Sequence, residues 1–355
     1  MQIYNEKKSL NGKKIMAKCI TIADIAQKLN LSRNTVSKAL NGKHVPDKTK
    51  REVLQAAAEL GYKSFPSLDN AYINLSGKNI LLISSNMLMN IAFHVHVMRG
   101  MENELAKLNM GLLRYTISAI SPMENLKEYI EKFEVDGILC MEFFKKNLIE
   151  QVLSLGLPTV FLDFSCERIE SPYPYDVVMM ENLSSVKEYC IDLAESGCRS
   201  FGFVGDIKNC LSFYERFLGM QCALQEKNIV YNPKNNVLAD NALPYNNIAK
   251  LAKLIKHCEL PDCFVCANDF LALMLLDALN TLEIHVPERI KVLGYENSAE
   301  SKISKPTLST INVNKTNLGK ELIHTLINRM NNRQQKTRFI YIKDIPVRRE
   351  TTNMI

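Results

Sequence analysis

The chain of 355 residues is long enough for two or three folding units, and 46% of its residues are hydrophobic, which suffices for a sizeable core. Its ten cysteines are scattered without a paired framework, and no apolar run approaches the ~20 residues that cross a bilayer. These features exclude a disulfide-stapled secreted domain and a membrane-spanning protein, and they predict a cytoplasmic chain with reduced thiols. The net charge of +6 is local, because residues 1–63 hold 13 Lys and Arg against 5 Asp and Glu, a net charge of +8.

The polar segment at the start of the chain has no helical or strand periodicity, and we expect residues 1–18 to form a basic tail. A second interpretation is that translation starts at Met16. Residues Gly12, Lys13 and Lys14 can be encoded by a purine-rich run similar to a bacterial ribosome-binding site. On that interpretation the segment upstream of Met16 is untranslated.

Residues 19–63 have the pattern of three short helices, the last from about Asp47 to Leu60. Thr21 is suited to open the first helix, and an apolar stripe at helical spacing follows it: Ile22, Ile25, Ala26 and Leu29. Asn30 tolerates the left-handed conformation of a tight turn, and Ser32 is suited to cap the second helix. The sequence therefore predicts an all-α helix-turn-helix domain.

The second helix, in the sequence SRNTVSKALN, turns Val36 and Ala39 inward. Its outer face then presents four polar side chains: Arg33, Asn34, Ser37 and Lys38. In a helix-turn-helix these positions enter the major groove, where Arg and Lys donate to guanine and Asn bonds the adenine edge. The alternative is an ordinary solvated helix face. It is disfavoured because the positive charge of the chain is concentrated in this module.

With the motifs TIADIAQKL, SRNTVSKALNG and ELGY, residues 21–62 resemble the DNA-binding domain of the lactose-repressor (LacI) family of bacterial transcription regulators. The resemblance implies that Arg33, Asn34 and Lys38 read bases. It implies that a second set holds phosphates or lies close to the duplex: Thr21, Ser32, Thr35, Ser37, Asn41 and His44. The partner implied is double-stranded DNA, in which a homodimer occupies a pseudo-palindromic operator.

Residues 64–78 are expected to form a linker, because Pro66, Gly77 and several turn formers interrupt any periodicity. In the family this stretch contains a hinge helix with an Ala-Arg-x-Leu core, which wedges a leucine into the minor groove. That core is absent here. Simple packing is the favoured role for the apolar residues that could otherwise supply a wedge: Leu68, Tyr72, Ile73 and Leu75.

From Asn79 the pattern changes to short apolar strands that alternate with amphipathic helices, which is typical of β-α-β units and a mainly parallel sheet. Strands are expected at 80–83, 112–115, 135–141, 158–163, 201–206, 263–269 and 290–297. Helices are expected at 96–108, 123–133, 148–155, 183–196, 214–227, 245–257 and 270–282. The simplest account is an α/β domain of two doubly wound parallel-sheet subdomains, residues 79–176 with 306–335 and residues 177–305 with 336–355.

Residues 79–355 resemble the type I periplasmic-binding-protein fold that the same family uses as its effector and dimerisation domain. Landmarks of the resemblance are VDGIL at Val135, GCRSFGFVGD at Gly197 and CANDFLAL at Cys266. The two subdomains are then expected to close on a small molecule at the carboxyl ends of the strands. The resemblance implies effector contacts at six positions: Asn86, Phe93, Asp163, Arg216, Asp269 and Asn297.

Several of these positions keep an alternative role. Asp163 can equally cap the following helix, and Arg216 can form a surface salt bridge. Where the family commonly has aspartates after a Gly-aromatic pair, this chain has Glu296 and Asn297. The identity of the effector therefore stays open, with a sugar or sugar derivative favoured by analogy and a nucleobase as the alternative.

Nothing in the sequence predicts catalysis, since no GxGxxG opens a helix after a strand and no Walker loop is present. We expect no catalytic residue, cofactor or metal site. Cys258, Cys263 and Cys266 beside His257 have the residue types of a zinc site, but the run CFVCA is better read as a buried strand. The rival classes are a solute-binding protein of the transport type, which needs an export signal and no DNA reader, and an enzyme on a doubly wound sheet.

Overall fold

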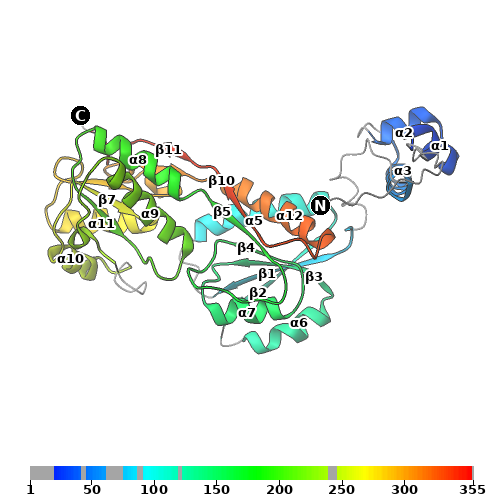
Figure 1. The fold of residues 1–355 in the computed structure, drawn as a ribbon, viewed down its shortest axis with the longest axis horizontal. Helices are drawn as coiled ribbons and strands as arrows, with labels where there is room; N and C mark the ends of the chain where they lie inside the picture. Colours follow the sequence, from blue (N-terminus) through cyan, green and yellow to red (C-terminus); the bar gives the residue numbers. More distant parts are fainter. Residues whose placement is uncertain are drawn as a thin grey trace, which may run out of the picture. The chain divides into compact units, whose positions relative to one another are not determined.

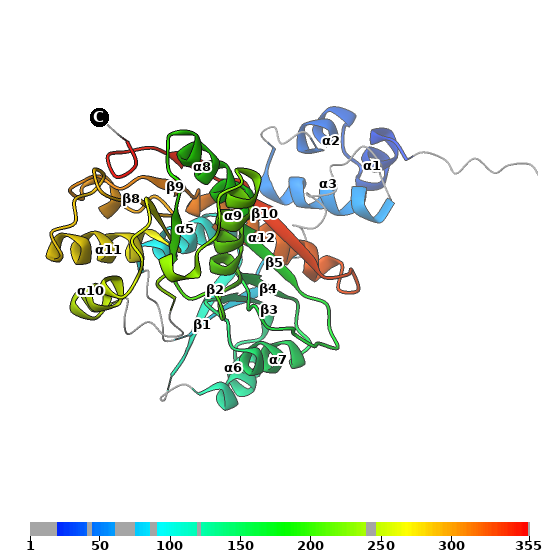
Figure 2. The ribbon, with the colours of Figure 1, turned by 60° about the vertical axis from the view of Figure 1, so that its left-hand side comes forward.

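The computed structural model describes residues 20–40, 45–60, 75–85, 91–118, 122–238 and 246–353. The chain divides into two compact units, Met1–Ser76 and Gly77–Ile355. Each unit is described by itself (Figures 1 and 2). The predictions for Asn41, His44 and Asn86, for the basic tail and for the linker before Leu75 lie outside the described residues.

The described residues of the first unit form three helices, α1 Ile22–Leu29, α2 Arg33–Leu40 and α3 Asp47–Leu60, as the sequence predicts. At the start of α1 the Asp24 carboxylate accepts from the backbone N–H and from the hydroxyl of Thr21, both at 2.7 Å. Asn30 ends α1 in the left-handed conformation at φ 54°. Buried apolar side chains join the three helices, among them Ile25, Val36 and Val53. The apolar faces of the three helices therefore pack into one small core.

The second unit begins with a parallel sheet of six strands in the order β10-β5-β4-β3-β1-β2. The strands are β1 Asn79–Ser85, β2 Gly111–Ile117, β3 Val135–Met141, β4 Thr159–Leu162, β5 Asp176–Met180 and β10 Arg338–Ile342. Helices cover both faces of this sheet (Figure 1). Every residue of β4 and β5 is accordingly buried, as a doubly covered parallel sheet requires.

The helices on one face of this sheet are α6 Leu126–Lys132, which follows the 3₁₀ turn η1 Met123–Asn125, and α7 Lys146–Ser154. On the other face α5 Ile91–Lys107 packs against α12 Lys315–Asn331. The two helices cross at glycines. A Cβ added at Gly319 would lie 2.0 Å from the carbonyl oxygen of Val97, and one added at Gly100 would lie 2.2 Å from that of Thr316. The absence of side chains at this crossing lets the two backbones touch.

A second subdomain has a parallel sheet in the order β6-β7-β8. Its strands are β6 Phe201–Val204, β7 Cys263–Cys266 and β8 Lys291–Leu293. Its helices pack as two pairs, α8 Leu183–Glu195 with α9 Leu211–Glu226, and α10 Ile248–Lys256 with α11 Asp269–Thr281. The antiparallel pair β9 Thr310–Asn312 and β11 Ile345–Val347 joins β8 through the bridges Leu293↔Ser309 and Glu296↔Asn312. Two short 3₁₀ turns, η2 Pro233–Asn235 and η3 Glu300–Lys302, complete it.

The strand pairing corrects the expected subdomain boundaries. Residues 177–180 belong to β5 and residues 338–342 form β10, and these strands pair with each other in the first sheet. Residues 310–312, expected in the first subdomain, form β9 of the second. The chain therefore passes between the subdomains after Met180, after Asn312 and after Ile342, and we call these three connections the crossovers. The alternation of strands and helices in the sequence could not predict these boundaries, because β5 and β10 are paired across more than 150 residues of sequence.

Candidate functional site

The second helix of the first unit begins at a capped turn. The Ser32 hydroxyl accepts a hydrogen bond from the backbone N–H of Thr35 at 3.0 Å, and the two hydroxyls lie 2.8 Å apart. The predicted N-cap is therefore confirmed, and it satisfies one of the amides that a helix start leaves without a partner. The cap fixes where α2 starts, and with it which side chains share its outer face.

That outer face carries the side chains expected to read DNA. Arg33, Asn34 and Lys38 are exposed, whereas Val36 and Ala39 on the opposite side are buried. The structure thus brings the three expected base readers to one face of one helix. Among the residues expected near phosphates, Ser32 and Thr21 are exposed, while Thr35 and Ser37 are half-buried.

In the second unit the expected effector residues that the structure describes, all except Asn86, lie where the two subdomains meet. We call this region the junction: it comprises the residues that follow strands β3, β4, β7 and β8, the starts of α5 and α9, and the three crossovers. Parallel strands of one sheet end at the same edge, so side chains that follow the strands of each sheet share one surface of that subdomain. Asp163 follows β4, and Asp269 follows β7 by three residues.

Arg216 is buried at the junction, with 3% of its surface exposed. Its Nε donates to the Asn182 side-chain oxygen at 2.9 Å, Nη1 donates to the Ala267 carbonyl at 2.5 Å, and the guanidinium lies 3.6 Å from the centre of the Tyr295 ring. No carboxylate of the described chain forms an ion pair with it. The alternative of a surface salt bridge is therefore wrong, because the side chain is enclosed between α9, β7 and β8.

Asp163 has the capping role that the sequence left open. Its Oδ1 accepts from the backbone N–H of Ser212 at 3.2 Å, and its Oδ2 accepts from the Cys210 thiol at 3.1 Å. The helix that it caps is α9 of the other subdomain rather than the next helix along the chain. Asp163 adopts a left-handed backbone conformation at φ 63°. It therefore ties the end of β4 to the second subdomain.

Asp269 is fully buried at the start of α11. Its Oδ1 accepts from the Thr310 hydroxyl at 2.6 Å, and its Oδ2 accepts from the backbone N–H of Ser298 at 2.7 Å. Burial raises the pKa of this carboxyl. Its observed contacts brace α11 against β9 and the loop after β8, and an effector contact by Asp269 stays a prediction.

Asn297 is likewise held by protein partners. Its amide nitrogen donates to Asn312 Oδ1 at 2.8 Å, and its oxygen accepts from an Arg349 Nη2 at 2.5 Å. These contacts connect the end of β8 to β9 and to the C-terminal segment. An effector contact by Asn297 also stays a prediction.

Phe93 on α5 belongs to a group of junction residues that the sequence did not predict as a set. The Phe93 ring meets His94 edge-on, and the Lys315 ammonium lies 5.9 Å from its centre. His94 Nε2 lies 3.2 Å from an oxygen of Glu142, the residue that directly follows β3. Glu142 could have been found by its place after a strand, but Lys315 reaches the junction only because the second crossover leads into α12.

The third crossover adds Asp344, which is 3% exposed. The Tyr295 hydroxyl, at the end of β8, lies 2.5 Å from Asp344 Oδ2 and 3.0 Å from the backbone oxygen of Glu181 on the first crossover. Burial raises the pKa of Asp344 to about 7. Tyr295 therefore links two of the three crossovers, a role that no local sequence pattern could reveal.

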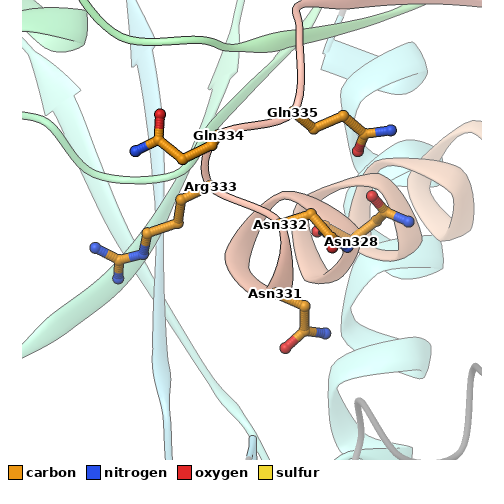
Figure 3. A pocket seen from close by; sticks show the side chains of 6 residues that line it. All are labelled: Asn328, Asn331, Asn332, Arg333, Gln334 and Gln335. Atoms are coloured by element: carbon orange, nitrogen blue, oxygen red, sulfur yellow. Dashed lines mark hydrogen bonds between the residues drawn. The ribbon is translucent and has the colours of Figure 1, made fainter. Parts of the chain in front are cut away.

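A surface hollow of about 540 Å³ lies elsewhere, at the C-terminal end of α12 and in the turn that leads to β10 (Figure 3). It is lined by exposed amide side chains and one arginine: Asn328, Asn331, Asn332, Arg333, Gln334 and Gln335. Because β10 starts beyond this turn, the hollow lies at the end of the sheet opposite to the junction. It brings together none of the expected effector residues.

The cysteines of β7 are placed in the core rather than in a metal site. Cys263 and Cys266 are buried in β7, as the buried-strand interpretation predicts, and burial raises the pKa of both thiols well above the ordinary value. In the described part of the chain no three His, Cys, Asp or Glu side chains are grouped to hold a metal ion. No helix there is both long and apolar enough to cross a membrane.

Comparison with known proteins relates both units to one group of regulators. Residues 21–64 match the family described as bacterial regulatory proteins, lacI family, and residues 192–352 match the periplasmic binding protein-like domain. The HTH-type transcriptional repressor PurR of Pasteurella multocida (strain Pm70) is 25% identical over 320 residues, which are 89% of this chain and 93% of that protein.

Two solved structures share the fold. The transcriptional regulator CelR in complex with cellobiose has a TM-score of 0.68 at 22% identity, covering 94% of this chain and 99% of that one. The lac repressor dimer bound to operator and the anti-inducer ONPF has a TM-score of 0.65 at 20% identity, covering 95% and 100%. The similarity to both structures therefore spans both units of the chain.

Proposed function

The chain is a DNA-binding transcriptional regulator of the lacI family, and we propose that it acts in the cytoplasm as a homodimeric repressor whose operator affinity is set by a small polar effector. The observation that supports the proposal is that one chain contains both a candidate DNA-binding site and a candidate effector site. One is the capped helix α2 with Arg33, Asn34 and Lys38 on its outer face, and the other is the junction of buried polar groups between two subdomains.

The reading of operator bases is assigned to α2. Arg33 and Asn34 lie in its first turn and Lys38 one turn later, so all three can reach base edges when the helix enters the major groove. Ser32, Thr35, Ser37 and Thr21, with Asn41 and His44, are proposed to hold the phosphates on either side. The net positive charge of residues 1–63 supplies the electrostatic part of binding.

A homodimer is proposed because the three-helix DNA-binding module is small. One module of three short helices buries too little surface to select an operator among many competing sites. Two modules on the half-sites of a pseudo-palindrome double the contacts and match the symmetry of a dimer. The similar lac repressor structure is a dimer on its operator.

The effector is proposed to bind at the junction. Its residues come from both subdomains and from all three crossovers, so a ligand there contacts every part that moves when the subdomains close. A sugar or sugar derivative is the proposed class, supported by the cellobiose that the similar CelR structure contains. Phe93 and the carboxylates of the junction supply the apolar face and the acceptors that a polyol requires. Asn86, Asp163, Arg216, Asp269 and Asn297 are the other proposed contacts or supports.

The DNA-reading part is tested by selecting operators from random duplexes with the full-length protein and measuring affinity by fluorescence anisotropy. Arg33→Ala should lose discrimination at one or two base pairs per half-site, at roughly 1–3 kcal/mol each. Lys28→Ala is the matched control, since it removes one positive charge from α1. Equal losses of affinity on all duplexes for Arg33→Ala would place this residue on phosphate instead.

The effector part is tested by repeating the operator titration with compounds that raise the melting temperature of the protein, because a ligand of the folded state raises it. At least one such compound should change operator affinity by fivefold or more, the lower end of typical coupling, ~1 kcal/mol. A compound that binds the effector domain tightly and leaves operator affinity unchanged would separate binding from regulation and contradict the proposal.

A further inference from the structure

A basic and polar segment leads from α12 into β10. Residues 322–343 contain five Lys and Arg and no Asp or Glu, whereas the whole chain has 44 basic and 38 acidic residues. Within this segment residues 331–337, which we call the polar turn, are all exposed. Together with Asn328 of α12, the first five residues of the polar turn line the surface hollow (Figure 3). The second unit therefore has an exposed concentration of positive charge outside the helix-turn-helix module.

The cations of this segment differ in their partners. Arg329 and Arg338 both pair with the buried carboxylate of Asp176, so most of their charge is compensated within the protein. Arg333 and Lys336 are exposed, and within the described part of the chain neither forms an ion pair with a carboxylate. The polar turn therefore presents two positive charges that an anion from outside can neutralise.

The backbone of the polar turn is held from beneath by Arg329, which is 1% exposed. Its guanidinium donates to the backbone oxygens of Gln335 and Lys336, the latter at 3.1 Å. The guanidinium is itself fixed by two hydrogen bonds to the carboxylate of Asp176. Because buried groups fix its backbone, a partner that binds the polar turn pays a smaller entropic cost of ordering it.

The side chains of the polar turn have the chemistry of a contact with phosphate and sugar. They are carboxamides, a guanidinium, an ammonium and a hydroxyl: Asn331, Asn332, Arg333, Gln334, Gln335, Lys336 and Thr337. Proteins bind the DNA backbone with these groups. The polar turn contains no aromatic or aliphatic side chain, so it lacks the apolar anchors of protein interfaces and the rings on which single-stranded bases stack. Double-stranded nucleic acid is the class of ligand that fits this chemistry best.

The polar turn lies at the edge of the first sheet where the chain from the DNA-reading unit enters. The strands from β10 to β1 are parallel, so β1 and β10 begin at the same edge. Gly77 shortly precedes β1, and the polar turn precedes β10. Residues 61–76, which separate α3 from Gly77, span at most about 60 Å of chain. This tether keeps a duplex bound by α2 within reach of that edge.

We propose that the polar turn is a second DNA-contacting element of this regulator. Arg333 and Lys336 neutralise backbone phosphates of the operator, and the neighbouring carboxamides bond phosphate or sugar oxygens. The contact adds affinity to a small three-helix module but carries no sequence information, because only base edges are read for sequence. The inference rests on DNA binding by this regulator and is independent of the identity of its effector.

The first test is the salt dependence of operator affinity, measured on the full-length protein by fluorescence anisotropy. Each phosphate contact contributes about 0.9 to the slope of log K against log salt. Arg333→Ala/Lys336→Ala should therefore flatten this slope by about 1–2 and lower affinity at ~0.1 M salt at least fivefold, with base preference unchanged. Lys253→Ala/Lys256→Ala, which removes two exposed charges from α10, is the matched control. An unchanged slope, or the same change in both double variants, overturns the proposal.

A neutral variant separates direct contact from a long-range electrostatic effect. Asn331→Ala/Gln334→Ala removes two exposed carboxamides and no charge. If these groups bond the DNA backbone, operator affinity should fall by about threefold or more while the salt slope stays that of the wild type. An affinity equal to that of the wild type would overturn the contact by the carboxamides.

Photocrosslinking locates the contact directly. Full-length Gln334→p-benzoylphenylalanine should crosslink to a duplex that extends beyond the two half-sites, whereas Lys256→p-benzoylphenylalanine on α10 should not. Crosslinks from position 334 to a second copy of the chain, without crosslinks to DNA, would assign the polar turn to a protein contact and overturn the proposal. If Arg33→Ala loses base discrimination while the polar-turn variants bind as the wild type does, the DNA reader stands and only the second contact is refuted.

Discussion

The variant Asp344→Asn tests, without any ligand, whether the Asp344 carboxyl is protonated in the folded protein. The Tyr295 hydroxyl has one proton but lies within hydrogen-bond distance of two acceptors, Asp344 Oδ2 and the backbone oxygen of Glu181. Both contacts are satisfied together only when Asp344 is protonated and donates to Tyr295. An asparagine at position 344 donates permanently through its amide, so it replaces the protonated carboxyl at every pH.

The sign of the effect follows from the pKa of Asp344, which burial raises from 3.8 to about 7. Between these values the folded chain keeps a proton that the unfolded chain has released, so the stabilising contribution of this group is lost as the pH rises toward 7. About two pH units of this range, from pH 5 to the folded pKa near 7, lie between pH 5 and pH 8. The corresponding loss of unfolding free energy is at most ~3 kcal/mol. Relative to the wild type, Asp344→Asn should gain ~1–3 kcal/mol of unfolding free energy over that range.

Urea unfolding followed by tyrosine fluorescence measures this difference, since the chain has 13 tyrosines and no tryptophan. None of the tyrosines lies in α1, α2 or α3, so the helices of the first unit do not contribute. Asp277→Asn, at an exposed position on α11, is the control and should track the wild type at both pH values. Parallel stability curves for Asp344→Asn and wild type, or a loss for the mutant as pH rises, would show that Asp344 is ionised in the folded protein and refute the reasoning.

Two further predictions concern local structure. Ser32→Ala removes the acceptor of the Thr35 amide at the start of α2 and should cost about 0.5–2 kcal/mol. Faster hydrogen exchange of the α2 amides would report this cost, and Ser32→Asn, which keeps a capping oxygen, should restore protection. Gly319→Ala places a methyl group against the Val97 carbonyl where α12 crosses α5 and should destabilise the second unit by ~1–3 kcal/mol. Lys320→Ala at the exposed neighbouring position is its control, and equal melting temperatures for the two variants would contradict the close contact.

The sequence by itself determined the helices of the first unit. In residues 21–60 the stripe of Ile25 and Ala26, the turn at Asn30 and the cap at Ser32 act over three or four residues, and each is visible without knowledge of the rest of the chain. Local hydrogen bonds and helical periodicity decide such elements. The same holds for β3, whose apolar run Ile138–Met141 predicts a buried strand.

Only the tertiary structure decided how the second unit is divided. The sequence contains no local pattern that assigns β10 to β5, because strand pairing between Arg338 and Asp176 depends on the path of the intervening chain. A buried charge confirms the pairing: Asp176 is fully enclosed and accepts from the guanidinium groups of both Arg329 and Arg338. Residues so far apart in sequence can be matched only once the fold has brought them together.

The same reason limits the candidate site. Asp163, Arg216 and Asp269 could be picked out from their places after strands or within a motif, but their partners could not. The structure joins Asp163 to α9 of the other subdomain and encloses Arg216 above the Tyr295 ring. It also places the Asp344 carboxyl at the Tyr295 hydroxyl, although the two residues lie on separate segments of the sequence. The electrostatics of the junction depend on distance and burial, and both are properties of the folded chain.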